Sequence, residues 1–363
     1  MPQKFQTSFY LFKRQKMRIL TIDLLKIISI FFVVISHVTL FFLLRDDNDV
    51  VLYFLRQIGQ LGVSLFFMCS GYFLLNNRHE KQVDYIINKA KGILTVLLFW
   101  LIFYYLYDTY FISKFTTVPN TNFLNYINVS RTTSDATHLW FIFAIVSLYI
   151  LTPLMRNAFN EKNAKGIMKI IVIMLIISNL TLLNALTDYK FSFSLIPFNI
   201  LLPFQAEGLI SFLIGGYLGL TKPKIKTFSC KHIMLLVFFI ISLISLSIIS
   251  SRTGMTFFYG KFYNVFLQVS SVFLFLFLVN LNINEIPCLI DDISKNTLGI
   301  YLVHNIFVIE IHNEFVHNLL LEKFNYINIY IYIIAYSLMA FILSYILCVL
   351  LKKSKITSKI ITI

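Results

Sequence analysis

The chain has 363 residues, of which 58% are hydrophobic and only 13% are charged. Roughly 25% of the residues in an ordinary soluble domain are charged, and a soluble globule cannot bury this much apolar surface, so the composition excludes that class and indicates a membrane protein. The formal net charge is +14. The lysines and arginines gather in short clusters between apolar runs, as they do in cytoplasmic loops, so we expect no nucleic-acid partner.

Long apolar runs divide the chain from end to end. They are about 20 residues long and lack the alternation of a membrane β-strand, so each run predicts a spanning helix and a β-barrel is excluded. We therefore expect an all-α, polytopic integral membrane bundle of about ten transmembrane helices. In chain order, the predicted spans are 19–44, 51–75, 93–112, 138–156, 167–187, 198–220, 232–251, 262–283, 296–317 and 326–351.

The basic residues predict the orientation of these spans. Ten spans place both termini on one side, and most of the 31 lysines and arginines then fall on that side, so we expect both termini to be cytoplasmic. Residues 1–17 form a cytoplasmic segment, 18–351 a single transmembrane domain, and 352–363 a cytoplasmic tail. The first span lacks a cleavage signal and is expected to stay as an anchor in the plasma or inner membrane, which makes the protein multi-pass.

The four cysteines give no support for a disulfide framework or a metal centre. They lie far apart, form no CxxC pair, and at least two of them fall within apolar runs. No metal is therefore predicted.

The first span carries three ionisable side chains, Asp23, Lys26 and His37, which are costly in a bilayer and are therefore functional candidates. At about 100° per residue, Lys26 and His37 lie within roughly 20° of each other, and Asp23 lies about 40° to the other side. His37 lies roughly 16 Å further from the cytoplasm than Lys26. This stripe could connect a cytoplasmic anion to a deeper reacting centre. Alternatively, Asp23 and Lys26 form a simple i,i+3 pair, and His37 is an interhelix hydrogen-bonding residue.

The second and fourth spans contain further candidates. Ser70 and Gly71 follow bulky aromatic residues in the second span, where small residues also allow close helix packing. His138 and Trp140 open the fourth span. Interface anchoring accounts for Trp140, but it explains His138 less well.

The sixth and ninth spans also hold polar groups. Glu207 follows Pro203 in the sixth span, and an acid beside a helix-distorting proline usually faces a cavity or a partner, although a structural pair with a lysine is an alternative. Tyr301 and His304 lie about one turn apart on one face of the ninth span. Such a concentration of polar residues predicts a polar interior.

Four stretches of the sequence carry a family resemblance. They are Asp23-x-x-Lys26 with His37 fourteen residues after Asp23; Leu65 to Tyr72; Thr137 to Phe141 with Leu148, Tyr149 and Pro153 downstream; and Leu298 to His304. Together they resemble the acyltransferase-3 family of membrane acyltransferases, in particular the small surface-polysaccharide O-acetyltransferases that lack an attached soluble domain. One position departs from the family pattern, because Lys26 stands where the family usually has arginine, and lysine lacks the planar fork that binds phosphate at two points.

The resemblance implies a membrane O-acyltransferase. It implies transfer of an acyl group, expected to be acetyl from acetyl-CoA, from the cytoplasm to a hydroxyl of a cell-surface glycan or its lipid-linked precursor. His37 would be the active-site histidine, with Asp23 as a second catalytic residue. Lys26, Arg18 and Arg78 would receive the phosphates of the donor. The candidate substrate-binding residues are Ser70, Tyr72, His138, Trp140, Glu207, Tyr301 and His304.

The chemistry of an imidazole fits this reaction in two ways. His37 can act as general base, taking the proton from a sugar hydroxyl as it attacks the thioester carbonyl, or it can form an acyl-enzyme. The sequence does not separate these routes.

Two other functions fit the same features. A transporter or flippase for a lipid-linked sugar also needs about ten helices and a polar interior, and the lysine at position 26 also fits an inactive subunit of a polysaccharide export complex. Consumption of acetyl-CoA by the purified protein would favour the enzyme, whereas glycan translocation without donor consumption would favour the transporter. Membrane lipids are expected contacts in every case.

Overall fold

The protein is a bundle of helices. The computed structural model describes residues 20–43, 49–77, 82–110, 122–129, 135–186, 206–222, 230–253, 264–281, 283, 285, 287–310 and 328–362. Its long helices are α2 (Leu20–Leu43), α3 (Val50–Leu74), α4 (Gln82–Tyr110), α6 (Trp140–Arg156), α7 (Ala164–Leu186), α9 (Ala206–Thr221), α10 (Cys230–Thr253), α12 (Val265–Val279), α14 (Thr297–Glu310) and α16 (Ile329–Lys352). The shorter elements are α5 (Phe123–Val129), η2 (Asp135–Leu139), η3 (Glu161–Asn163), α13 (Cys288–Lys295) and α17 (Lys355–Ser358).

Each of the ten predicted spans overlaps one of the long helices. Within the described residues, six helices are long and apolar enough to cross a membrane, and shorter apolar helices lie at Gly208–Thr221, Val265–Val279 and Thr297–Val308. The all-α polytopic membrane bundle predicted from the sequence is thus confirmed. The start of α4 differs from the prediction, because the helix begins at Gln82 rather than near residue 93. Lys89 and Lys91 interrupt the apolar run without interrupting the helix, since lysine is a good helix former.

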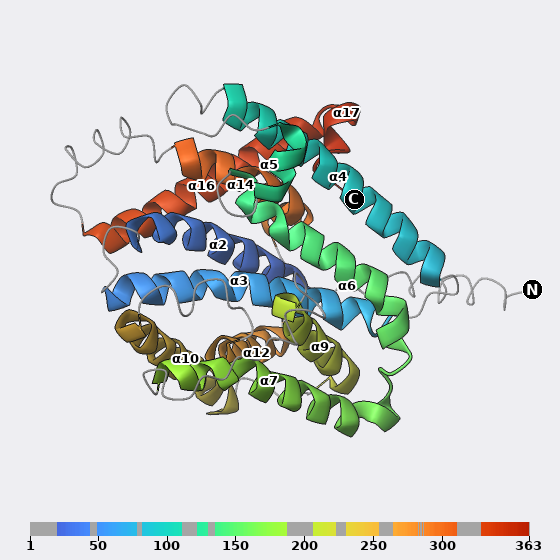
Figure 1. Ribbon diagram of the computed structural model, residues 1–363, viewed down its shortest axis with the longest axis vertical. Coiled ribbons are helices and arrows are strands. Elements are labelled where there is room, and N and C mark those ends of the chain that lie inside the picture. Colours follow the sequence, from blue (N-terminus) through green and yellow to red (C-terminus); the bar gives the residue numbers. More distant parts are fainter. Residues whose placement is uncertain are drawn as a thin grey trace, which may run out of the picture.

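Helices α2 and α3 lie side by side at the centre of the bundle (Figure 1). On one side of this pair, α4, α6, α14 and α16 pack around one hydrophobic core. On the other side, α7, α9, α10 and α12 pack around a second core. Both cores include residues of α2 and α3, so the central pair fixes the position of the two halves.

The central helices approach one another closely because glycines face their partners. A Cβ atom at Gly62 would lie 2.2 Å from the carbonyl oxygen of Ser29 on α2. A Cβ atom at Gly71 would lie 1.8 Å from the carbonyl oxygen of Phe212 on α9. Only glycine allows backbones to meet at these distances, which is a common way to pack helices in membranes. The packing interpretation of Gly71 is thereby confirmed.

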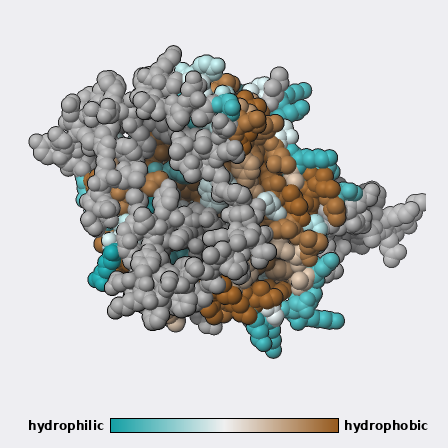
Figure 2. Space-filling model, in the orientation of Figure 1, coloured by the Kyte–Doolittle hydropathy of each residue, from teal (hydrophilic) through white to brown (hydrophobic). Residues whose placement is uncertain are grey.

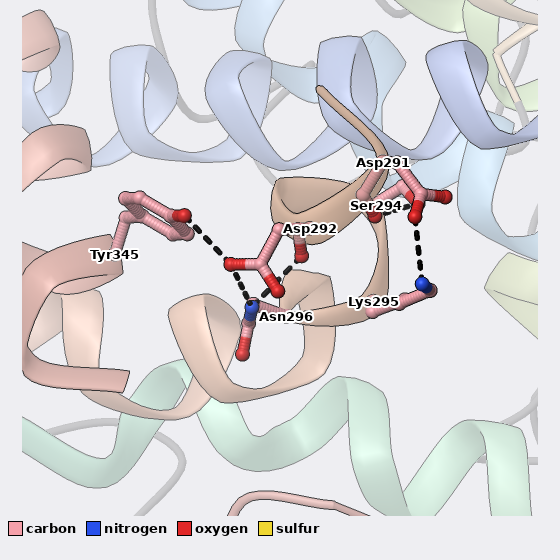
Figure 3. A network of polar contacts seen from close by, with 6 residues as sticks. All are labelled: Asp291, Asp292, Ser294, Lys295, Asn296 and Tyr345. Carbon is pink, nitrogen blue, oxygen red and sulfur yellow. Dashed lines mark hydrogen bonds and ion pairs between the residues drawn. The ribbon is translucent and has the colours of Figure 1, made fainter. Parts of the chain in front are cut away.

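A polar network fastens the start of α14 (Figure 3). The Tyr345 hydroxyl on α16 donates to Oδ2 of Asp292 at 2.6 Å. The Asn296 side-chain amide donates to the Asp292 carbonyl oxygen at 2.8 Å and to its Oδ2 at 3.2 Å. Asp292 thus connects α13 and α16 to the residue that directly precedes α14. This fixes Thr297 and the turn that follows it.

Apolar side chains cover the outside of the bundle. Along α4, Leu94, Leu98, Ile102 and Leu106 are exposed at a spacing of four residues, with Leu98 52% exposed. Figure 2 shows hydrophobic side chains gathered over the described part of one face, with hydrophilic ones towards its margins. A surface of this kind is stable in lipid and not in water.

We predict that Gly71→Ala destabilises the bundle by about 1–3 kcal/mol, because the added methyl group forces α3 and α9 apart. Gly166 on α7 is the matched control, since a Cβ atom there meets no atom within 4 Å. Gly166→Ala is expected to leave stability unchanged or raise it by up to about 1 kcal/mol, because alanine favours the helix. Thermal unfolding of both variants in the same detergent measures the difference. Equal melting temperatures would contradict the role given to Gly71.

Candidate active site

Three histidines from three separate elements meet in the half of the bundle formed by α2, α4, α6, α14 and α16. His37 lies on α2, His138 on η2 and His304 on α14. The ring centroid of His37 is 5.2 Å from that of His304 and 6.4 Å from that of His138, and the His138 and His304 centroids are 5.1 Å apart. The structure therefore brings together three residues that are up to 267 positions apart in the sequence.

Exposure separates the three histidines. His138 and His304 are buried, at 2% and 0% exposure, whereas His37 is only partly buried. His37 is thus the member of the cluster that a substrate can reach most readily.

The hydrogen bond of His304 fixes the orientation of its ring. Nδ1 lies 2.6 Å from the carbonyl oxygen of Tyr301, and a carbonyl oxygen can only accept, so Nδ1 donates. A neutral ring then has its lone pair on Nε2. That nitrogen is buried and has no hydrogen-bond partner among the described residues. A buried acceptor beside His37 is suited to orient the His37 ring or to receive a proton from it.

Two tyrosines hold this cluster in place. The Tyr301 hydroxyl donates to the carbonyl oxygen of His138, which ties η2 to α14. Tyr104 on α4 packs against His138 with ring centroids 5.1 Å apart, and its hydroxyl donates to the carbonyl oxygen of Leu302 at 2.9 Å. Both hydroxyl groups bond to backbone, so they set the spacing of α4, η2 and α14 around the imidazoles.

Arg56 of α3 adds a positive charge beside His37. Its Nη1 donates to the carbonyl oxygen and to the hydroxyl of Ser36, the residue before His37. It also interacts electrostatically with the His37 ring. Arg56 is not among the candidate residues selected from the sequence. The signal was present, because an arginine at the sixth position of a predicted span is an ionisable group within the apolar run.

A cavity of about 330 Å³ lies near the end of the bundle where α2 and α14 begin and α3 ends. Lys26, Ser70 and Cys69 line it from α2 and α3, Thr297 and Tyr301 from α14, and further residues from α4 and α6. Under the predicted orientation this is the cytoplasmic end. The cavity is walled mainly by apolar and aromatic side chains with a few polar groups, as is usual for small-molecule sites.

Lys26 is held at the edge of this cavity. Its Nζ lies 3.2 Å from Oδ1 of Asp23 and 5.8 Å from the centroid of the Phe73 ring. Its side chain keeps about a third of its surface exposed, whereas that of Asp23 is 9% exposed. The i,i+3 pairing that the sequence suggested is therefore present, and it does not prevent Lys26 from facing the cavity.

Tyr301 joins the two regions. Its side chain lines the cavity, and its ring centroid lies 5.5 Å from that of His138 and 5.7 Å from that of His304. The cavity and the histidine cluster are therefore neighbours that share Tyr301. Asp23 does not belong to that cluster, because the 14 positions from Asp23 to His37 correspond to about 21 Å along a helix.

Two of the remaining predicted residues, Tyr72 and Trp140, pack against other aromatic side chains. Tyr72 packs against Phe73 and Phe275, and Trp140 packs against Phe141. Glu207 lies in the first turn of α9, and its side chain is outside the described part of the structure. Arg18 and Arg78 both lie outside the described residues.

The histidine cluster consists of closely packed rings. Among the residues that the structure describes, no three His, Cys, Asp or Glu side chains are arranged to hold a metal ion. The three imidazoles stack edge to face or at a tilt, with His37 and His138 at 86°.

These observations define a multi-pass membrane protein with a cavity beside a cluster of three imidazoles. A family model described as an acyltransferase domain matches residues 19–351. Because this match spans nearly the whole chain, the protein belongs to the acyltransferase-3 family and is a membrane acyltransferase. No curated protein and no solved structure gives a further match.

Proposed function

We propose that the protein is an O-acetyltransferase that takes an acetyl group from cytoplasmic acetyl-CoA and transfers it to a hydroxyl of a cell-surface glycan or its lipid-linked precursor. The observation that carries the proposal is that Tyr301 lines the cavity at Lys26 and also packs against His138 and His304, so the cavity and the histidine cluster are neighbours. A donor whose thioester lies deep in this cavity approaches the imidazoles while its anionic end stays near Lys26.

His37 is the general base in this mechanism. It is the least buried of the three histidines, so an acceptor hydroxyl can come within hydrogen-bond distance of its ring. His37 removes the hydroxyl proton as the oxygen attacks the thioester carbonyl. A carbon–oxygen bond forms, the carbon–sulfur bond breaks, and the proton leaves with the sulfur of the donor. The apolar walls of the cavity exclude water that would otherwise compete with the acceptor.

His304 and Arg56 orient His37 from two neighbouring helices. The buried Nε2 of His304 is an acceptor beside the His37 ring, and an N–H of His37 that points to it leaves the other His37 nitrogen free to act as base. Arg56 holds the backbone of Ser36 and so fixes the turn of α2 that carries the imidazole. Both residues are therefore positioning residues rather than reacting groups.

Lys26 takes the anionic part of the donor. Its side chain lines the cavity, and the ion pair with Asp23 holds the ammonium group there. Because the Lys26 side chain is partly exposed, an anion can still contact the ammonium group. A lysine binds phosphate as a point charge and not as a fork, which suits a phosphate that approaches from the cytoplasm in more than one orientation.

We predict that His37→Ala lowers acetyl transfer to the glycan by about 10²–10⁴-fold, because a positioned general base contributes roughly that factor. The assay measures transfer of radiolabelled acetyl from acetyl-CoA to surface glycan in membranes that contain equal amounts of each variant. His232→Ala is the matched control, since this histidine lies in the first turn of α10, and α10 packs against α3 and α12. Transfer at the wild-type rate by inserted His37→Ala protein would remove the mechanism.

We expect Lys26→Met to raise the KM for acetyl-CoA by about tenfold, because a charge-assisted contact to phosphate is worth roughly 1.5 kcal/mol or more. Lys26→Arg keeps the charge and is the matched variant, with a KM close to the wild-type value. Steady-state kinetics gives the comparison, and thermal unfolding separates it from the loss of the pair with Asp23. Equal KM values for methionine and arginine at this position would assign the donor phosphates to other residues.

A further inference from the structure

The end of the chain folds back onto the bundle. The indole Nε1 of Trp100 on α4 donates to the carbonyl oxygen of Ile360 at 2.8 Å. The next residue, Ile361, is 2% exposed and belongs to the same hydrophobic core as α4 and α14. Residues 352–363 were expected to form a tail beyond the transmembrane domain. Its described part is instead anchored, which brings Lys359 and Thr362 to a fixed place beside α4.

This anchored tail borders a second hollow, of about 520 Å³. Helix α4 forms one side of the hollow with Tyr85, Asn88, Lys89 and Thr95. The last three follow Tyr85 by three, four and ten positions, which places all four on one face of the helix. The other side carries Lys359 and Thr362 of the tail. The hollow therefore exists only because the tail is docked.

The polar groups of the hollow suit an anion. Lys89 and Lys359 supply two positive charges from two separate elements, and no aspartate or glutamate is among the described residues that line it. Asn88 supplies a further amide donor, whereas the hydroxyls of Thr95 and Thr362 donate to the carbonyl oxygens of Lys91 and Ser358. Two lysines with a neutral amide donor beside them suit a phosphate group.

The hollow adjoins the donor cavity. Tyr85 lines both of them, and the consecutive residues Gly92 and Ile93 of α4 line one each. A molecule with a thioester on a flexible arm and phosphates at its far end can therefore occupy the cavity and the hollow together. A lipid headgroup offers the same phosphate chemistry, but it has no thioester arm that would extend past Tyr85 into the cavity.

We propose that this hollow, bordered by Lys89 and Lys359, binds phosphate groups of the nucleotide end of the acyl donor. The inference rests on the proposed function, since it assigns the part of acetyl-CoA that lies outside the cavity at Lys26. It also gives the C-terminal tail a role in donor binding. The tail contributes Lys359 directly, and its anchoring to Trp100 sets the width of the hollow.

The test compares full-length proteins in nanodiscs of neutral phosphatidylcholine. The variants are Lys89→Gln, Lys359→Gln and the double substitution, which remove charge and keep a polar side chain. Lys353→Gln is the matched control, because Lys353 is an exposed lysine just after α16 that does not line the hollow. Equilibrium binding of CoA gives Kd, and acetyl transfer gives KM and kcat for acetyl-CoA and for S-acetylpantetheine, a donor without phosphate.

We expect each single substitution to raise the Kd for CoA and the KM for acetyl-CoA by about fivefold, and the double substitution by more than tenfold, because each lysine gives a modest charge-assisted contact. The kcat is expected to stay at the wild-type value. With S-acetylpantetheine the variants and the wild type should be equal, and Lys353→Gln should match the wild type throughout.

Two results would overturn the inference. The first is an unchanged Kd for CoA in the double variant. The second is an effect of the lysine substitutions that occurs only in nanodiscs containing anionic phosphatidylglycerol, which would assign the hollow to a lipid headgroup. Failure of the proposed function is a separate result. Lysine-dependent binding of CoA by a wild-type protein that transfers no acetyl group would refute the function and keep the nucleotide site.

Discussion

Helices in a bilayer gain little by burying apolar side chains against one another, since lipid is equally apolar, so this bundle depends on how closely its backbones approach. The glycines of α3 provide that approach. Gly62 meets the backbone of Ser29 on α2, and Gly71 meets the backbone of Phe212 on α9. Because α3 contacts both neighbours at backbone distance, it carries Arg56 to the turn of α2 that precedes His37, and Ser70 to the wall of the cavity. The site thus depends on a packing constraint that involves no catalytic group.

The same packing divides the molecule into two regions with different chemistry. At the end of the bundle where α2 begins, lysines and hydroxyl groups surround a cavity and an adjoining hollow, and both are suited to a long anionic donor. Deeper in the bundle, His37 forms a cluster with His138 and His304, which are both buried, while His37 itself is only partly buried. Tyr301 connects the two, as a wall of the cavity and as a donor to the His138 backbone. This division supports the proposed function, in which the donor occupies the first region and the imidazoles act on the acceptor.

Several features of this arrangement could be predicted from the sequence. Hydropathy located all ten long helices, because insertion of a helix depends on its own residues. The rule that ionisable groups within spans are functional candidates selected all three histidines of the cluster. The same rule, applied less strictly at the helix end, missed Arg56. It also selected Asp23 as a catalytic residue, and about 21 Å of helix separates Asp23 from His37.

The sequence by itself therefore determined the membrane environment, the positions of the helices, and the residues that are too polar to face lipid, since all three follow from local composition. Only the tertiary structure decided which of these residues meet. The contacts between His37 and His304, between Trp100 and Ile360, and between Tyr345 and Asp292 join positions that are 53 to 267 residues apart. Such contacts depend on helix crossing distances and on the docking of the tail. Both are properties of the packed bundle, and no single segment contains them.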